Sequence, residues 1–189
     1  MQSAQKVFIT GASSGIGSAL ARLYAKQGAF LGLAARRGDQ LQTLAKALTS
    51  AGATQVHCYP LDVTDAAVLR LAAEDFIARL GVPDIVIANA GVSGGTLTEC
   101  VEDLEVIKRI LEINVYGMAA TFSPFIAAMR KNAKSGKPGR LVGIASVAGI
   151  RGLPGAEAYS ASKAAAITYL ESLRLELRSS GVKVVTIAP

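Results

Sequence analysis

Cysteine and histidine are scarce in this sequence, which contains Cys58, Cys100 and His57 and no others of either type. The two cysteines show neither C-x-x-C nor metal-ligand spacing, and a structural zinc site needs about four nitrogen or sulfur ligands. Three such side chains cannot supply that set. We therefore predict no metal site, and reduced cysteines as in a cytoplasmic protein.

Long apolar runs are also absent. No uninterrupted apolar stretch approaches the roughly 20 residues that span a membrane. Residues 1–6 lack a charged head followed by an apolar segment of signal-peptide length. Export and membrane insertion are therefore disfavoured, and we predict a cytoplasmic protein with no membrane partner.

Acidic residues are fewer than basic ones, 14 against 20, which gives a formal net charge of +6. Such a charge raises the question of a nucleic-acid partner. The densest basic run, residues 130–140, has no aromatic side chain and contains the glycine and proline typical of a solvated loop. We predict no nucleic-acid binding, because an anionic small ligand is the better match for this charge.

A glycine-rich turn follows the first expected strand. Lys6–Thr10 has the apolar character of a short buried strand, and residues 11–17 lead from it into a helical pattern. This order aims backbone N–H groups at a phosphate. The G-x-x-x-G-x-G spacing differs from the common G-x-G-x-x-G, and flexible turns also collect glycine. The candidate cofactor-binding residues here are Gly11, Ser13, Ser14, Gly15, Ile16 and Gly17.

The second expected strand, residues 29–35, stops at Arg36 and Arg37. In a dinucleotide site the end of this strand lies beside the adenosine ribose, where an acid binds a free 2′-hydroxyl and an arginine accommodates a 2′-phosphate. Two guanidinium groups at this point favour NADP(H) over NAD(H). The alternative is that the two arginines only keep a strand end soluble.

Strands and helices alternate along the rest of the chain. Such alternation favours an α/β fold in which helices cover both faces of a parallel sheet. The length of 189 residues, 51% of them hydrophobic, fits a single domain over residues 1–189. Either Thr64 or Asp65 can cap the third helix. The remaining expected elements are helices over 41–48, 64–80, 103–129 and 159–177, and strands over 55–59, 84–91, 140–146 and 182–189.

A tyrosine and a lysine at helical spacing follow the fifth strand. Tyr159 and Lys163 lie four residues apart and share one helix face, and Ser146 ends the strand before them. A lysine ammonium beside a phenol favours the phenolate, which is the form a proton-transferring tyrosine needs. Taken alone, a Y-x-x-x-K pair is more often an exposed helix turn.

Together these motifs resemble those of the short-chain dehydrogenase/reductase family, and the resemblance covers essentially the whole chain. It implies a doubly wound, Rossmann-like sheet of strand order 3-2-1-4-5-6. It also implies hydride transfer between a nicotinamide cofactor and a small carbonyl or alcohol substrate. The matching segments are Thr10-Gly-Ala-Ser-Ser-Gly-Ile-Gly17, Asp62-Val63, Asn89-Ala-Gly91, Asn114, Ser146 and Tyr159-Ser-Ala-Ser-Lys163.

The resemblance also implies a role for each matching residue. Tyr159 would be the acid and base, Ser146 would hydrogen-bond the substrate oxygen, and Lys163 would bind the nicotinamide ribose and make the tyrosine more acidic. Asn114 would hold a water for proton relay. Asp62 would face the adenine, and Asn89 would lie over the adenosine ribose and brace the middle of the sheet. The residues that would also contact the cofactor are Val63, Ala90, Gly91 and Tyr159.

Two departures from the family pattern limit this transfer of roles. The usual asparagine pair is here Ala88-Asn89, and the family normally continues beyond Pro189 into a substrate loop and a seventh strand. We therefore expect the chain to lack the C-terminal part of its domain, to leave the sixth strand at a sheet edge, and to turn over poorly by itself. The substrate pocket would include Ser93, Gly94, Gly95, Arg151, Leu153 and Pro154.

The family commonly dimerises through the Tyr159 helix and the Asn114 helix, so a homodimer or a higher homo-oligomer is expected. A dinucleotide-binding regulatory or interaction protein with little or no catalysis is the alternative function. The presence of Asn114, Ser146, Tyr159 and Lys163 together argues against that alternative.

Overall fold

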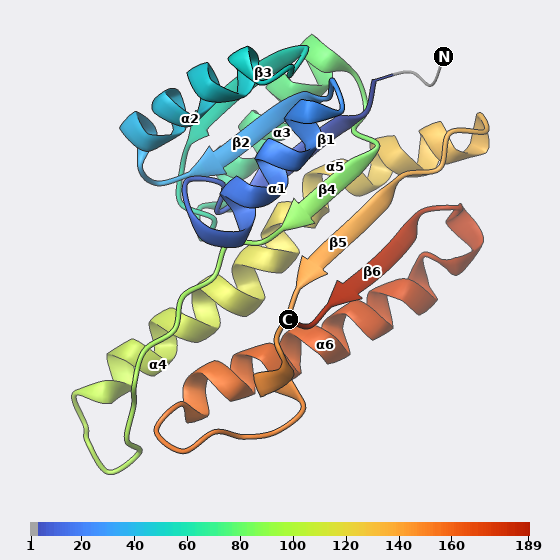
Figure 1. Cartoon of the computed structure of the whole chain (residues 1–189). Coiled ribbons are helices and arrows are strands. Elements are labelled where there is room, and N and C mark those ends of the chain that lie inside the picture. The colour runs from blue at the N-terminus through green and yellow to red at the C-terminus, as the bar shows by residue number, and fades with distance from the viewer. Residues whose placement is uncertain (1–3) are drawn as a thin grey trace.

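The computed structural model describes residues 4–189, and a parallel sheet runs through its centre (Figure 1). The strand order in the described chain is β3-β2-β1-β4-β5-β6, which confirms the predicted topology. The order reverses between β1 and β4, the point at which open α/β sheets place ligands. The strands are β1 (Lys6–Thr10), β2 (Phe30–Ala35), β3 (Gln55–Pro60), β4 (Ile85–Ala88), β5 (Arg140–Ile144) and β6 (Lys183–Ile187).

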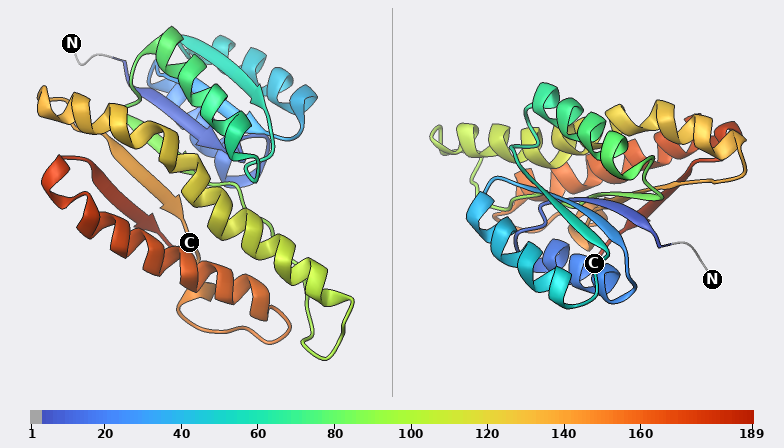
Figure 2. Two further views of the ribbon diagram at one scale, coloured as in Figure 1. Left: turned by 180° about the vertical axis from the view of Figure 1, so that it is seen from behind. Right: turned by 90° about the horizontal axis from the view of Figure 1, so that it is seen from above.

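Helices cover both faces of the sheet, as predicted. Figure 2 shows α1 (Gly15–Lys26) and α2 (Gly38–Ser50) on one side of it. The other side carries α3 (Ala66–Leu80), α5 (Gly117–Lys134) and α6 (Glu157–Glu176). Asp65 is the residue that caps α3, because its carboxylate accepts the N–H groups of Ala67 and Val68.

Each face of the sheet has its own apolar core. Beneath α3 and α5, the ring of Phe8 packs edge-on against Phe76 and tilted against Phe125, with ring centroids 5.5 and 5.0 Å apart. Gly32 of β2 is a glycine because a Cβ there would stand 2.6 Å from Phe76 and 2.7 Å from Phe8. The aromatic rings therefore pack directly on the backbone of β2.

One long helical segment connects the two halves of the chain. α4 (Asp103–Leu111) passes through a π-helical segment, η1 (Glu112–Tyr116), into α5 without a break. By length and composition Asp103–Lys134 could cross a membrane, but half of its most apolar window is buried inside the protein. Packing in the core accounts for that apolar character.

The predicted end of this helix was wrong. α5 continues past Met129 to Lys134, so the first part of the basic run is helix and only the following residues form a loop. No glycine or proline interrupts residues 125–134, and lysines in a last turn interact favourably with the helix dipole. The helix stops just before Gly136, whose φ of +82° suits a glycine.

β6 lies at the edge of the described sheet, as expected, and one side chain covers part of that edge. Lys183 and Ile187 direct their backbone hydrogen bonds toward the β5 side. Because backbone groups alternate in direction along a strand, the carbonyl of Val184 points away from β5. Arg174 of α6 donates to the Val184 carbonyl at 3.0 Å and to the Thr186 hydroxyl at 3.0 Å. This contact occupies hydrogen-bonding groups of the edge strand and so hinders pairing with a further strand.

Candidate active site

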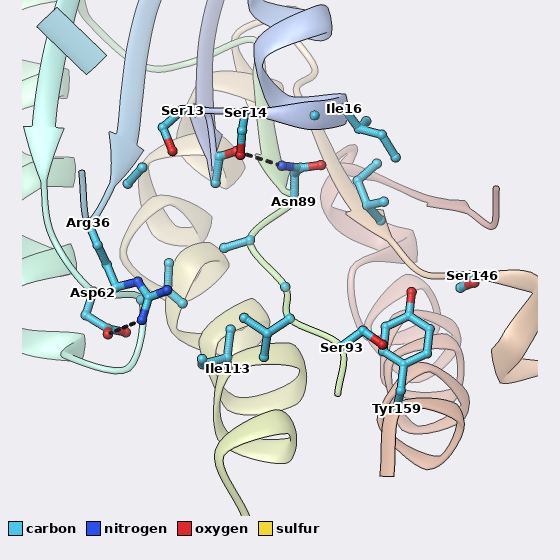
Figure 3. A pocket seen from close by; sticks show the side chains of 18 of the residues that line it. Ser13, Ser14, Ile16, Arg36, Asp62, Asn89, Ser93, Ile113, Ser146 and Tyr159 are labelled. Atoms are coloured by element: carbon cyan, nitrogen blue, oxygen red, sulfur yellow. Dashed lines mark hydrogen bonds and ion pairs between the residues drawn. The ribbon is translucent and has the colours of Figure 1, made fainter. Parts of the chain in front are cut away.

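A cleft of about 510 Å³ opens at the carboxyl ends of the strands (Figure 3). All of the predicted catalytic and cofactor-binding residues line it except Gly17 and Asn114. Predicted residues in its wall are Gly11, Ser13, Ser14, Gly15, Ile16, Arg36, Arg37, Asp62, Val63, Asn89, Ala90, Gly91, Ser93, Ser146, Tyr159 and Lys163. The sequence did not single out the apolar remainder, Ala35, Leu61, Val92, Ile113, Ile144, Ala145 and Pro189.

The glycine-rich turn has the backbone that a phosphate site requires. Gly11 and Gly15 have φ of +64° and +54°, a region that favours glycine. A Cβ on Gly17 would collide with the Gly11 carbonyl and stand 2.6 Å from Asn89, so this glycine lets α1 pack closely on the turn. Ser14 makes no side-chain cap to α1, which leaves the first N–H groups of the helix available to an anion.

Asn89 joins the end of β4 to the end of β1. Its amide nitrogen donates to the carbonyls of Thr10 and Gly11 at 3.0 and 3.2 Å, and its backbone N–H donates to the Thr10 hydroxyl at 3.2 Å. These bonds cross the point where the strand order reverses. Asn89 therefore braces the middle of the sheet.

Two basic side chains, Arg36 and Arg37, follow β2 directly and line the cleft. Arg37 donates to the hydroxyls of Ser13 and Ser14 at 3.1 and 2.9 Å, which holds its guanidinium beside the glycine-rich turn. Arg36 lies 4.0 Å from a carboxylate oxygen of Asp62 (Figure 3). Both arginines are thus at the place where the sequence predicted them.

Asp62 is held by more partners than the sequence indicated. One carboxylate oxygen accepts the N–H and the hydroxyl of Thr64, and the other accepts Arg109 at 2.8 Å. Partial burial raises the pKa of Asp62, but the bonds from Thr64 and Arg109 outweigh it, so the pKa is lowered overall. Arg109 was missed, since no local pattern marks it and only the fold brings α4 beside the end of β3.

Ser146, Tyr159 and Lys163 meet at the far end of the cleft. The Tyr159 hydroxyl points toward Ser146 (Figure 3). The Lys163 ammonium lies 5.6 Å from the centre of the Tyr159 ring. Lys163 is 4% exposed and donates to the Ile144 carbonyl at 2.9 Å, and its burial lowers its pKa. The Ser146 hydroxyl accepts the N–H of Ala148 at 3.2 Å.

Asn114 is buried at the π-helical segment and braces the loop after β4. Its amide group donates to the Val92 carbonyl and to the Ser162 hydroxyl, both at 2.9 Å, and accepts the Val92 N–H at 2.8 Å. A Cβ on Gly91 would stand 3.2 Å from this amide and 3.5 Å from the Lys163 ammonium. Asn114 therefore lies behind the wall of the cleft, close to Lys163.

Two loops project beyond the sheet at the carboxyl ends of its strands (Figure 1). The loop after β4 and the loop before α6 are joined by the Thr96 N–H, which donates to the Gly155 carbonyl at 3.2 Å. Of the residues expected to shape the substrate pocket, Ser93 lines the cleft. Because the loops bond to each other instead of crossing the cleft, the others lie outside its wall: Gly94, Gly95, Arg151, Leu153 and Pro154.

Within residues 4–189, no three His, Cys, Asp or Glu side chains gather in a way that could hold a metal ion. Cys58 and Cys100 are free thiols, so the described chain has no disulfide between them. The expected absence of a metal site stays a prediction.

Comparison with known proteins identifies the family. The family model for short chain dehydrogenases matches residues 5–189. The chain belongs to the short-chain dehydrogenase family. An uncharacterized oxidoreductase of Myxococcus xanthus is 45% identical over 96% of this chain and 69% of its own length. The 11-beta-hydroxysteroid dehydrogenase-like protein 3 of Arabidopsis thaliana is 37% identical over 97% of this chain and 57% of its own length.

Solved structures of short-chain dehydrogenases match the fold closely. The 3-ketoacyl-(acyl-carrier-protein) reductase of Brucella melitensis, complexed with NADH, has a TM-score of 0.90 and 27% identity over 98% of this chain and 75% of its own. The alcohol dehydrogenase of the archaeon Thermococcus sibiricus, complexed with 5-hydroxy-NADP, has a TM-score of 0.88 and 29% identity over 98% and 75%. This chain therefore spans between about half and three quarters of the proteins it matches.

Proposed function

We propose that the protein is an oxidoreductase that transfers a hydride between NADP(H) and a small carbonyl or alcohol substrate, with Tyr159 as acid and base. One observation carries the proposal. A single cleft has a phosphate-type glycine turn and two arginines at one end, and Ser146, Tyr159 and Lys163 at the other. A dinucleotide long enough to span the cleft would bring its nicotinamide end to these three side chains.

The residues present fit a nicotinamide dinucleotide. The pyrophosphate would sit at the N-terminus of α1, where Gly15 faces open space and no side chain caps the helix. Asp62 and Asn89 would contact the adenosine half, and Lys163 would contact the nicotinamide ribose. When bound, the cofactor supplies or accepts the hydride at the substrate carbon.

The chain itself manages the substrate oxygen and its proton. In the reducing direction, negative charge develops on that oxygen, the Ser146 hydroxyl donates a hydrogen bond to it, and Tyr159 delivers a proton to it. In the oxidising direction, Tyr159 accepts the alcohol proton. The buried ammonium of Lys163 stabilises the tyrosinate that remains after proton donation.

The preference for NADP(H) over NAD(H) rests on this chain's own side chains. The related structures were solved with either type of cofactor, so they support a nicotinamide dinucleotide without choosing between the two. Arg36 and Arg37 stand where a 2′-phosphate would arrive, and Arg37 is already oriented by Ser13 and Ser14. A phosphate offers these guanidinium groups charge and acceptors that a free hydroxyl lacks.

A dinucleotide-binding regulatory protein with little catalysis is the second candidate. The observation in its favour is the open substrate side, where the two loops stand clear of the cleft and Val101 and Ile150 are 73% and 68% exposed. In either case we propose that residues 1–189 form one dinucleotide-binding domain.

We also propose a homodimer or higher homo-oligomer assembled through α4 and α6, in the cytoplasm. Apolar side chains stand exposed on these helices, among them Leu104 at 53% and Leu175 at 72%. Light scattering at micromolar concentration tests the assembly, and a monomer would contradict it. Leu175→Lys should weaken an assembly that uses α6, whereas Leu71→Lys on α3 should not.

The function is tested by following nicotinamide absorbance with NADPH and a panel of aldehydes and ketones. A loss of absorbance that requires both enzyme and carbonyl supports the oxidoreductase. Tight NADPH binding with no turnover, in this direction or with NADP⁺ and a panel of alcohols, favours the regulatory protein.

A further inference from the structure

Arg109 of α4 reaches the acidic residue at the cofactor end of the cleft. Its guanidinium donates to the Asp62 carboxylate at 2.8 Å, and its other terminal nitrogen pairs with Glu112 at 3.3 Å. Arg109 does not line the cleft, so its contact with the site runs through Asp62. A residue that lies 47 positions from Asp62 along the chain thereby enters the predicted adenosine-binding region.

The contacted oxygen of Asp62 is the one that also attracts Arg36. Arg109 approaches it to 2.8 Å and Arg36 to 4.0 Å, while the second carboxylate oxygen is occupied by the N–H and hydroxyl of Thr64. The nearer guanidinium satisfies the oxygen, because Coulomb attraction and hydrogen bonding both fall with distance. Arg36 is left with a long contact and a largely exposed side chain.

We propose that Arg109 determines cofactor specificity indirectly: by occupying Asp62, it keeps the Arg36 guanidinium available for the 2′-phosphate of NADP(H). Arg109 is thus a positioning residue, since it touches neither cofactor nor substrate. The inference rests on the proposed preference for NADP(H) and adds a residue that is outside the cleft.

Loss of Arg109 would change the partner of Arg36. The Asp62 oxygen would then have Arg36 as its remaining neighbouring guanidinium, and the exposed Arg36 side chain needs to move only about 1 Å to reach hydrogen-bond distance. A guanidinium committed to Asp62 has fewer donors for a phosphate. The carboxylate, no longer neutralised by Arg109, would also repel the doubly charged 2′-phosphate.

The experiment compares the affinities of NADPH and NADH by titration, using the ratio of the two dissociation constants as the readout. A general loss of structure or of adenine contacts changes both affinities and leaves the ratio in place. Arg109→Gln should reduce the preference for NADPH by about fivefold, the effect expected of a surface ion pair. Glu112→Gln, which removes the other partner of Arg109, should leave the ratio unchanged.

Two further variants separate this mechanism from simple charge. Lys108→Gln removes the same charge from the neighbouring position and should change the ratio by less than about twofold. In an Asp62→Asn background, where no carboxylate remains to capture Arg36, Arg109→Gln should have no more effect than Lys108→Gln.

The inference would be overturned if Arg109→Gln and Lys108→Gln changed the ratio of dissociation constants equally. It would also be overturned if Arg109→Gln changed that ratio as much in the Asp62→Asn background as in the wild type. A wild type that prefers NADH would contradict the proposed cofactor preference, while the change that Arg109→Gln makes in the ratio would still decide the role of Arg109. A wild type that binds neither dinucleotide would contradict both.

Discussion

The two ends of the cleft differ in how firmly the described chain holds them. At the cofactor end, Asn89 ties two strands together, Arg37 bonds two serines, and Asp62 has both of its oxygens occupied. At the substrate end, Ser146, Tyr159 and Lys163 are in place, but the loops beyond them expose large apolar side chains. Cofactor binding and turnover should therefore be separable by mutation.

The largest separation should come from Tyr159→Phe. Removing the phenol takes away the proposed proton donor, so turnover should fall by about 10³-fold, within the range for general acid catalysis. NADPH affinity should stay within about twofold of wild type, because the hydroxyl points to Ser146 and is proposed to act on the substrate oxygen. Steady-state rates and NADPH titration give the two quantities.

Tyr169→Phe is the matched control for this change. Tyr169 lies on the same helix and is partly buried against the core. Its hydroxyl is outside the cleft, so this variant should keep wild-type turnover. Turnover by Tyr159→Phe equal to that of Tyr169→Phe would refute the assigned role.

Gly17→Ala should damage the cofactor end by itself. The new methyl group would collide with the Gly11 carbonyl and the Asn89 amide, and both are backbone or braced groups that cannot yield cheaply. We expect a loss of about 1–3 kcal/mol in the free energy of unfolding and a clear weakening of NADPH binding. Chemical denaturation and titration measure the two effects. Gly152→Ala meets no atom within 4 Å and should be neutral.

Arg36→Gln should weaken the binding of NADPH much more than the binding of NADH. Losing a charge-assisted contact to the 2′-phosphate should weaken NADPH by about tenfold and NADH by less than about twofold. Arg70→Gln, which disturbs only an exposed pair with Glu74 on α3, is the control. Equal losses for NADPH and NADH would mean that Arg36 contributes general positive charge and does not recognise the phosphate.

The smallest effect should be a pH dependence that originates at Lys163. Burial lowers the pKa of Lys163 below its ordinary value of 10.5, so the unfolded chain binds more protons between the lowered pKa and 10.5. The stability of wild type relative to Lys163→Met should rise with pH through this range and be constant below it. Urea unfolding at a series of pH values, with the exposed Lys131→Met as control, measures this. A difference that falls as pH rises would contradict it.

Much of the fold was predictable because its signals are local. The alternation of apolar strands and helices predicted a parallel sheet covered by helices on both faces, while the strand order followed from the resemblance to the short-chain dehydrogenase/reductase family. The end of α5 was misplaced because the whole run of charge was interpreted as a loop, although nothing in residues 130–134 breaks a helix. Gly136 marks the end of this helix better than the start of the basic run does.

The site residues that escaped prediction depend on tertiary contacts. Arg109 becomes visible only when α4 packs beside the end of β3, and the π-helical segment at Asn114 has no sequence signature of its own. The hydroxyl of Ser162 supports Asn114 across a separation of 48 residues. Such partners follow from packing and cannot be inferred from spacing.

The most direct test of the account is isotope transfer from NADPH that carries deuterium on the reactive carbon of its nicotinamide. Wild type and Tyr159→Phe are incubated with a ketone panel, and the product alcohol is analysed by mass spectrometry. The account predicts deuterium on the carbinol carbon with wild type and about 10³-fold less product with Tyr159→Phe. Wild type that binds NADPH but transfers no deuterium to any ketone would contradict it.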